Sequence, residues 1–243
     1  KARENHRIIS KAFMIAYATD DQGHREILGF GVYANESKET WKSFIRDFKA
    51  RGLRNVLMIT SDAHEGLCDA ISKEFPQAAW QRCQFHFSKN IAEKAPKKYQ
   101  AGIRSELSEM FNCITIEEAR RKRDSIIADY QEVAESAMTC LDEGFESSMT
   151  AMILPKYLRQ YFRTSNHIER INRELKRRSK VIGVFPNEAS ILRLMGSVLM
   201  ELNDAAQARK VLFSPKTYNK LMSTEVKNKL IILANEQQLL RVS

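Results

Sequence analysis

The sequence predicts a mixed α/β fold that is interrupted by an all-helical segment. Three observations lead to this prediction. A strand hairpin comes first, short apolar strands then alternate with helices, and residues 98–161 have purely helical periodicity. The 243 residues are enough for one large domain or two small ones. This order of elements is typical of a mixed sheet with helices on both faces.

The hairpin is predicted from residue type and from its turn. Residues 8–18 are rich in β-branched and aromatic side chains and predict a strand, residues 20–23 predict a turn, and residues 26–33 predict the antiparallel partner. Residues 37–50 then predict a helix, because their large apolar side chains recur on one helical face: Trp41, Phe44, Ile45 and Phe48.

Alternation of strands and helices follows the hairpin. The continuous apolar run at residues 56–59 predicts a strand that is buried on both faces. A helix at 63–75, a short strand at 79–82 and a helix at 83–93 are predicted next.

The helical segment has its own start and stop signals. Thr115 and Glu118 have the spacing of a capping box, and the apolar residues after them keep helical spacing until Gly144. The stretch from 188 to 240 is also predicted to be helical.

Composition excludes several classes of protein. No apolar stretch approaches the roughly 20 residues of a membrane span, so we expect no membrane association. The four cysteines are widely spaced, unlike a disulfide framework, which favours a reducing compartment such as the cytoplasm.

The positive charge is concentrated in one stretch. Lys and Arg number 39 against 30 Asp and Glu, a formal net charge of +9. Nine basic and only two acidic residues lie between Pro155 and Phe185. A local positive field favours a polyanionic partner, with nucleic acid the default. A solvated helix face explains the charge equally well.

Asp62 is the first candidate site residue. It follows the apolar strand, and in open α/β sheets ligands bind outside the carboxyl ends of the strands. The alternative is a structural role, because Asp62 and Glu65 have the spacing of a capping box at the start of the next helix. The two roles are compatible, since one carboxylate oxygen can cap the helix while the other faces a metal.

Glu169 is the second candidate. On a helical wheel it lies beside the apolar stripe of its helix, with Arg173 and Lys176 on its own face. Such a carboxylate stays ionised and can hold a divalent metal near a phosphate. The alternative is again a capping box, formed by Asn166 and Glu169.

Cys83 and His86 have the spacing of half a zinc site. Structural zinc needs four ligands, and no second Cys/His pair occurs at ligand spacing, so we expect no zinc. Two metals held by carboxylates are, by contrast, the standard device of phosphodiester chemistry, and Asp62 and Glu169 suit that arrangement.

Three stretches resemble the motifs of bacterial Mutator-type transposases. The first is Ser-Asp-Ala-His-Glu-Gly-Leu at 61–67, and the second is Ala-Trp-Gln-Arg-Cys-Gln-Phe-His-Phe at 79–87. The third is Thr-Ser-Asn-His-Ile-Glu-Arg-Ile-Asn-Arg at 164–173, followed by Val-Phe-Pro-Asn-Glu-Ala-Ser at 184–190. The resemblance runs from Lys1 to about Asn203, and the ordered combination is far more specific than any single motif.

The resemblance implies a ribonuclease-H-like mixed sheet with helices on both faces, interrupted by an all-α insertion, and an Asp-Asp-Glu catalytic triad. Asp62 matches the second acidic residue and Glu169 the third, and both are then metal ligands. Cys83 and His86 match the Cys/Asp-x2-His signature, which we expect near the active site. Two Mg²⁺ ions, for which Mn²⁺ can substitute, are the implied cofactors.

The resemblance also implies an activity and its partners. The enzyme is expected to cut double-stranded DNA at transposon ends and to join the freed 3′-hydroxyl to target DNA, as a homodimer or higher oligomer in the bacterial cytoplasm, at the nucleoid. Basic residues after Glu169 are expected to contact phosphates: Arg170, Arg173, Lys176, Arg177 and Arg178.

In one respect the sequence departs from the family pattern. The first Asp of the triad is expected on a strand just before the 8–18 strand, and no suitable Asp is present there. We expect that strand and its Asp to precede Lys1, and the 243-residue chain alone to cleave no DNA.

The sequence accordingly divides into four predicted parts. Residues 1–97 form the first part of the core, 98–163 the helical insertion, 164–203 the last core helices and 204–243 a helical C-terminal tail. Two alternatives to a transposase remain: a non-catalytic nucleic-acid-binding module, and another nuclease on the same fold, such as a junction-cleaving enzyme.

Overall fold

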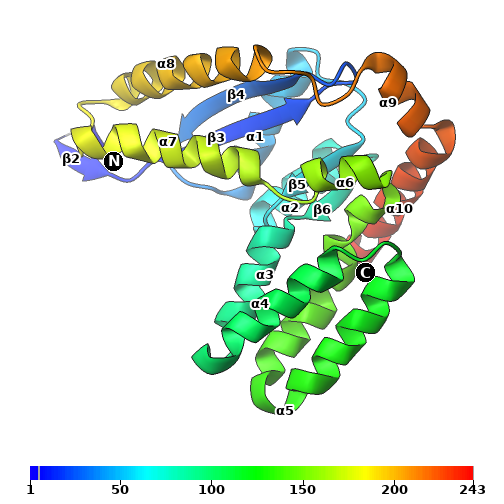
Figure 1. The fold of residues 1–243 in the computed structure, drawn as a ribbon. Helices are drawn as coiled ribbons and strands as arrows, with labels where there is room; N and C mark the ends of the chain where they lie inside the picture. The colour runs from blue at the N-terminus through cyan, green and yellow to red at the C-terminus, as the bar shows by residue number, and fades with distance from the viewer. Residues whose placement is uncertain (5, 243) are drawn as a thin grey trace. The chain divides into compact units, whose positions relative to one another are not determined.

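The computed structural model describes residues 1–4 and 6–242 and has a mixed α/β fold, as predicted (Figure 1). The chain divides into two compact units, each built from separate segments. Unit 1 contains Lys1–Asn55, Glu65–Glu74 and Asn166–Ser223. Unit 2 contains Val56–His64, Phe75–Ser165 and Thr224–Ser243. No helix among the described residues is both long and apolar enough to cross a membrane.

The strands are short, and their bounds are β1 (Ala2–Glu4), β2 (Arg7–Ile9), β3 (Ala12–Thr19), β4 (Arg25–Tyr33), β5 (Met58–Ser61) and β6 (Ala79–Arg82). The helices are α1 (Lys38–Ala50), α2 (Glu65–Glu74), α3 (Gln84–Glu93), α4 (Lys97–Phe111), α5 (Ile116–Ser148), the 3-10 helix η1 (Thr150–Ile153), α6 (Lys156–Phe162), α7 (Asn166–Ile182), α8 (Glu188–Gln207), α9 (Pro215–Leu221) and α10 (Thr224–Val242).

Unit 1 is built on the predicted hairpin. Strands β3 and β4 pair antiparallel, with a register shift between Ala16 and Tyr17. In the turn, the Asp20 carboxylate accepts hydrogen bonds from the backbone N–H groups of Gln22 and His24. The single strand predicted at 8–18 is in fact two, because β2 ends at Ile9 and pairs with β1 instead.

Helices cover both faces of the β3–β4 hairpin. Met14 packs with Phe44 and Phe48 of α1, whereas the neighbouring Phe13 and Ile15 pack against the cluster of α7 and α8. This follows from the two-residue period of a strand, which sends successive side chains to opposite faces. Figure 1 shows α7 and α8 running alongside the hairpin.

Unit 2 contains the parallel strand pair. Strand β5 pairs with β6 in a register that sets Met58 opposite Ala79 and Ser61 opposite Arg82. The sequence predicted the first of these strands two residues too early, and β6 at its observed bounds. The side-chain amide of Gln237 in α10 accepts from the backbone N–H of Trp80 and donates to its carbonyl. This amide occupies backbone groups of β6 that another strand would otherwise pair with.

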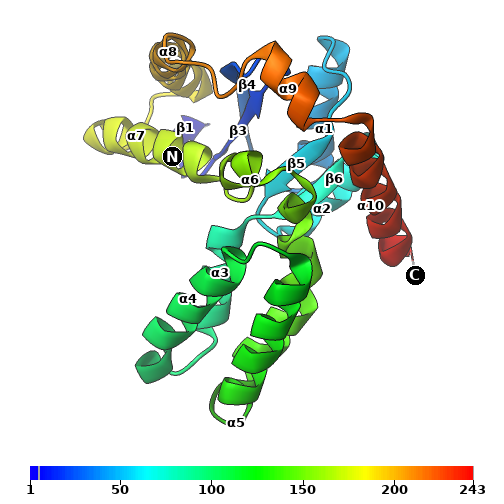
Figure 2. The same cartoon turned by 45° about the vertical axis from the view of Figure 1, so that its right-hand side comes forward.

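The helical part of unit 2 has its own core, formed mainly by α3, α4 and α5 (Figure 2). The predicted capping box is present, because Thr115 accepts from the Glu118 N–H and Glu118 accepts from the Thr115 N–H. The spacing predicted that the helix ends at Gly144. This is wrong, because α5 continues to Ser148. A Cβ at Gly144 would meet the ring of Phe87, which is fully buried. The glycine therefore allows α3 and α5 to approach closely.

We expect Gly144→Ala to lower the free energy of unfolding by about 1–3 kcal/mol, because the added methyl group overpacks the contact with Phe87. Urea denaturation followed by circular dichroism measures the change. The control is Ser125→Ala, at an exposed position of the same helix, which should stay within about 0.5 kcal/mol of the parent. Equal stabilities for the glycine variant and the control would contradict the close-approach argument.

Candidate active site

Asp62 lies directly after β5, at the carboxyl end of the parallel strand pair in unit 2. Its side chain is exposed, and the backbone N–H of Cys83, directly after β6, donates to the Ser61 carbonyl at 2.7 Å. Helix α2 begins at Glu65, three residues after Asp62. The structure thus brings Asp62 and the Cys83–His86 signature to the same edge of one strand pair.

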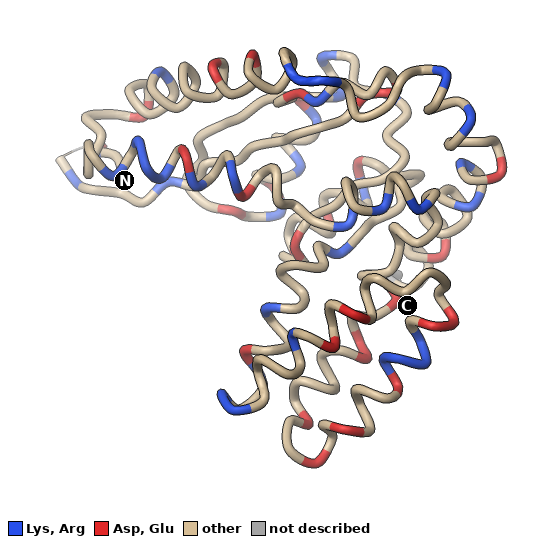
Figure 3. The backbone as a smooth tube through the Cα atoms, in the orientation of Figure 1, with Lys and Arg blue, Asp and Glu red and all other residues tan. Residues whose placement is uncertain are grey.

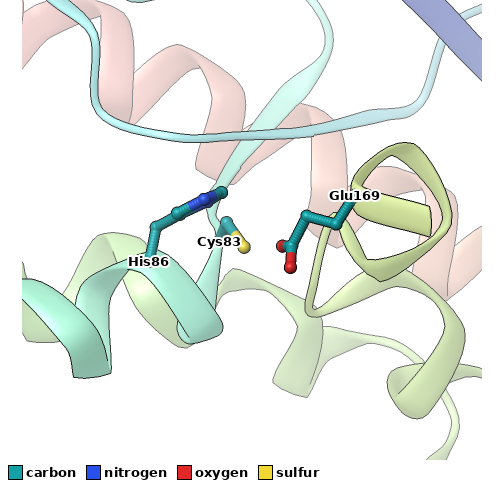
Figure 4. A group of neighbouring side chains, drawn as sticks. All are labelled: Cys83, His86 and Glu169. Atoms are coloured by element: carbon teal, nitrogen blue, oxygen red, sulfur yellow. The ribbon is translucent and has the colours of Figure 1, made fainter. Parts of the chain in front are cut away.

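Cys83 and His86 sit at the start of α3 (Figure 4). The Cys83 side chain is fully buried, and its sulfur accepts from the Ser165 N–H at 3.3 Å and lies 3.1 Å from the Ser165 hydroxyl. Burial by itself raises the pKa of the Cys83 thiol, but hydrogen bonds with His86 and Ser165 outweigh burial and bring the pKa below its ordinary value. The thiol therefore acts as a hydrogen-bonding group toward both His86 and Ser165.

The four residues 162–165, here called the 162–165 linker, are tied to the carboxyl ends of both strands. The Thr60 hydroxyl at the end of β5 donates to the Phe162 carbonyl at 2.5 Å. After β6, the Gln84 N–H donates to the Arg163 carbonyl at 3.0 Å, and Cys83 holds Ser165. All of these groups belong to unit 2. The linker is thus fixed beside the point where Asp62 leaves β5.

Neither Thr60 nor Ser165 is recognisable from the sequence as a residue that shapes this site. Both are small hydroxyl residues without a distinctive spacing, and their partners lie 102 and 82 positions away in the chain. The only available signal was that Thr60 directly precedes the motif at 61–67 and that Ser165 lies within the motif at 164–173.

Glu169 belongs to unit 1, in the first turn of α7, and is half-buried. Ile171 and Leu175 form the buried stripe of this helix, as the periodicity predicted. Arg173 and Lys176 follow Glu169 by four and seven residues, and this spacing places all three on one face. Helix α7 begins at Asn166. Asn166 is therefore the first helical residue and not the residue before the helix, which is the position that a capping box with Glu169 requires.

The five basic residues of α7 that were expected to contact phosphates fall into two groups. Arg177 and Arg178 pair with Glu174, at 2.6 and 2.9 Å, and their hydrogen bonds lower the pKa of Glu174 to about 2. Within the described part of the chain, Arg170, Arg173 and Lys176 are exposed and form no ion pair. Figure 3 shows several basic positions in blue along α7, with acidic positions in red between them. The second group therefore offers uncompensated charge to an anion.

His167, at the start of the same helix, packs on Tyr17 of β3 with ring centroids 5.3 Å apart. Burial first, and then the charges of Arg25, Arg170 and Arg209, lower the pKa of His167. The imidazole is therefore neutral near pH 7 and acts as an aromatic contact between α7 and the hairpin.

Fold and side chains together define an α/β protein with an acidic residue at a strand end and a second one on a cationic helix. Comparison with known families identifies the class. The model of the family "Transposase, Mutator family" matches residues 1–208, and the chain belongs to this family.

Curated relatives agree with this assignment. The transposase for insertion sequence element IS256 in transposon Tn4001 from Staphylococcus aureus is 40% identical over 206 residues, which cover 84% of this chain and 53% of that protein. The transposase for IS1081 from Mycobacterium tuberculosis is 36% identical, covering 84% of this chain and 49% of that protein. The transposase for IS406 from Burkholderia multivorans is 35% identical, covering 87% and 55%. The chain spans about half the length of these relatives.

We expect Cys83→Ala to loosen the 162–165 linker, because the substitution removes the acceptor of the Ser165 N–H. Hydrogen exchange measured by mass spectrometry should become about 2- to 10-fold faster in the peptide that contains Ser165, the range expected for one hydrogen bond. The control is Cys140→Ala, a buried thiol on α5, which should leave that peptide unchanged. Equal exchange in the two variants would rule out an anchoring role for Cys83.

Proposed function

We propose that the full-length protein is a transposase that cuts double-stranded DNA at the ends of its element and joins the freed 3′-hydroxyl to target DNA. In this proposal the core is ribonuclease-H-like, and Asp62 and Glu169 are the second and third acidic residues of its triad. The observation that carries the proposal is the anchored 162–165 linker.

The linker restricts where Glu169 can lie. Ser165 is held by Cys83, whose N–H bonds to the residue before Asp62. Glu169 follows Ser165 by four residues, and an α-helix rises about 1.5 Å per residue, so the Glu169 backbone begins roughly 6 Å along α7 from that anchor. The covalent connection therefore supports a site in which the carboxylates of Asp62 and Glu169 act together.

The donor set fits the expected cofactor. Carboxylate oxygens are the ligands that Mg²⁺ and Mn²⁺ prefer, and Asp62 has an exposed carboxylate at a strand end. Two such ions supply activation of the attacking oxygen and stabilisation of the leaving oxygen in phosphodiester chemistry. Asp62 and Glu169 would hold them, together with a third acidic residue.

Cys83 and His86 take a positioning role in this proposal. Cys83 holds the 162–165 linker, and the hydrogen bond with His86 helps to keep its thiol in place. Neither side chain needs to contact the reacting phosphate. The rest of the proposal follows the expected division of the chain, with 98–163 as an insertion between core segments and 204–243 as a C-terminal tail, and a dimeric or larger assembly on DNA in the bacterial cytoplasm.

We expect Asp62→Asn and Glu169→Gln in the full-length protein each to lower DNA cleavage and strand transfer at least about 100-fold, because these carboxylates would hold the metal ions, which supply several kcal/mol of transition-state stabilisation. DNA affinity should stay nearly constant. A gel assay with Mg²⁺ and element-end DNA measures both cleaved and joined products.

The matched control is Glu174→Gln on the same helix, which removes a carboxylate that pairs, within the described residues, with Arg177 and Arg178 alone. It should keep catalysis within a few-fold and bind DNA at least as tightly. Full activity of Glu169→Gln would remove Glu169 from the site, and cleavage without joined products would favour a hydrolytic nuclease.

The two groups of basic residues on α7 should contribute unequally to DNA binding. Arg173→Ala or Lys176→Ala should weaken binding roughly 3- to 10-fold and lower the slope of log affinity against log salt by about one, the effect of one lost phosphate contact. Arg177→Ala should cost less, because its charge is already balanced by Glu174. Fluorescence anisotropy at several salt concentrations measures the slopes, and equal losses in all three variants would contradict the distinction.

A further inference from the structure

We propose that a pocket in the helical part of unit 2 binds a phosphate group of the DNA backbone. The space between its walls amounts to about 430 Å³, a volume that includes open solvent. Its walls come from the end of α4, from η1 and from α6, with Gln84 at the start of α3. The lining residues are Gln84, Phe111, Asn112, Cys113, Ala151, Met152, Lys156, Arg159 and Arg163.

The lining is cationic within an otherwise acidic helical block. Lys156, Arg159 and Arg163 contribute three positive charges, and the lining residues include no carboxylate. Residues 98–154, in contrast, contain eleven Asp and Glu against six Lys and Arg. Figure 3 shows acidic positions distributed along α4 and α5. An anion would therefore be attracted by the three cations of the pocket itself, because the surrounding helical block is net acidic and repels it.

Both arginines are held in place by backbone carbonyls. Arg159 donates from Nε to the Leu154 carbonyl and from Nη1 to the Ile114 carbonyl, each at 2.8 Å. Arg163 donates from Nη1 to the Phe111 carbonyl at 3.1 Å and to Asn112 Oδ1 at 2.9 Å. Fixed guanidinium groups lose little side-chain entropy when they bind an anion.

The positive charges of the pocket are not compensated. Within the described residues, the ion pairs include neither the two arginines nor Lys156, whose side chain is exposed. Each guanidinium has donors left over from its carbonyl contacts, and Lys156 has its whole ammonium group. Burial also lowers the pKa of Arg159, so a bound anion would relieve a desolvated cation.

The position of the pocket points to DNA as the source of the phosphate. Gln84 and Arg163 line it, and the hydrogen bond between their backbones is one of those that hold the 162–165 linker. A strand of DNA that reaches the proposed catalytic edge of β5 and β6 thus lies close to this pocket. The inference rests on the proposed function in taking DNA as the polyanion and in taking the edge of β5 and β6 as the place that the DNA reaches.

The lining residue Cys113 offers a direct test. It is half-buried, whereas Cys68, Cys83 and Cys140 are buried and serve as internal references. In the full-length protein, we expect saturating duplex DNA to slow alkylation of Cys113 by N-ethylmaleimide at least threefold, roughly the effect of a site occupied most of the time. Mass spectrometry measures the modification of each cysteine, and unchanged alkylation at full DNA occupancy would overturn the proposal.

A charge variant gives an independent readout. Lys156→Ala should weaken DNA binding roughly 3- to 10-fold, lower the salt slope by about one and reduce the protection of Cys113. Lys97→Ala, at an exposed lysine of the same unit that forms no ion pair within the described residues, should change neither affinity nor protection. If the two variants have equal effects, the loss of affinity reflects only the lower net charge of the protein, and the proposed phosphate site is overturned.

Inorganic phosphate at matched ionic strength distinguishes the two sources of the anion. Protection of Cys113 by DNA, with or without weaker protection by inorganic phosphate, supports the proposal, and protection by inorganic phosphate alone overturns the assignment to DNA. If the parent protein binds no DNA at all, the proposed function is overturned as well. Intact DNA binding with an unprotected Cys113 would overturn only the pocket.

Discussion

The hydrogen bonds that hold the 162–165 linker are the constraint on which the site depends. Thr60, Cys83 and Gln84 lie at the carboxyl ends of β5 and β6, and each fixes one residue of that linker. These contacts join parts of the chain that are more than 75 residues apart. Without them, a long helical segment would leave the 162–165 linker unrelated to the strand that precedes Asp62.

The helical segment can separate the two motifs because it is attached firmly to the strands at its return point. The buried Gln81 side chain donates to the Ser148 carbonyl and accepts from the Ala151 N–H, and Gln84 donates to the same Ser148 carbonyl. Buried amides that satisfy backbone groups fix the end of α5 against β6. The chain therefore leaves the strand pair through α3 and returns to it at η1, independently of the length of the helices between.

Most helices and strands could be predicted from residues close together in the sequence. The features that could not be predicted depend on contacts between residues far apart in the chain. The turn at Asp20, the capping box at Thr115 and strand β6 follow from residue types close together in the sequence. The error at Gly144 is different, because the ring that requires a glycine there belongs to Phe87, on another helix. Spacing likewise identified the acidic candidates, but it could not reveal that Ser165 meets Cys83.

Helix α7 combines two opposing electrostatic demands. Its free cations favour phosphates but disfavour a divalent cation, whereas Glu169 on the same face does the reverse. On the proposed function, a DNA phosphate neutralises Arg173 and Lys176 and so lowers the repulsion of a metal at Glu169. The same reasoning applies in the other direction, since binding free energies are reciprocal. On that proposal, joint occupancy by DNA and metal is favoured over either alone, which would suit an enzyme that acts only on bound DNA.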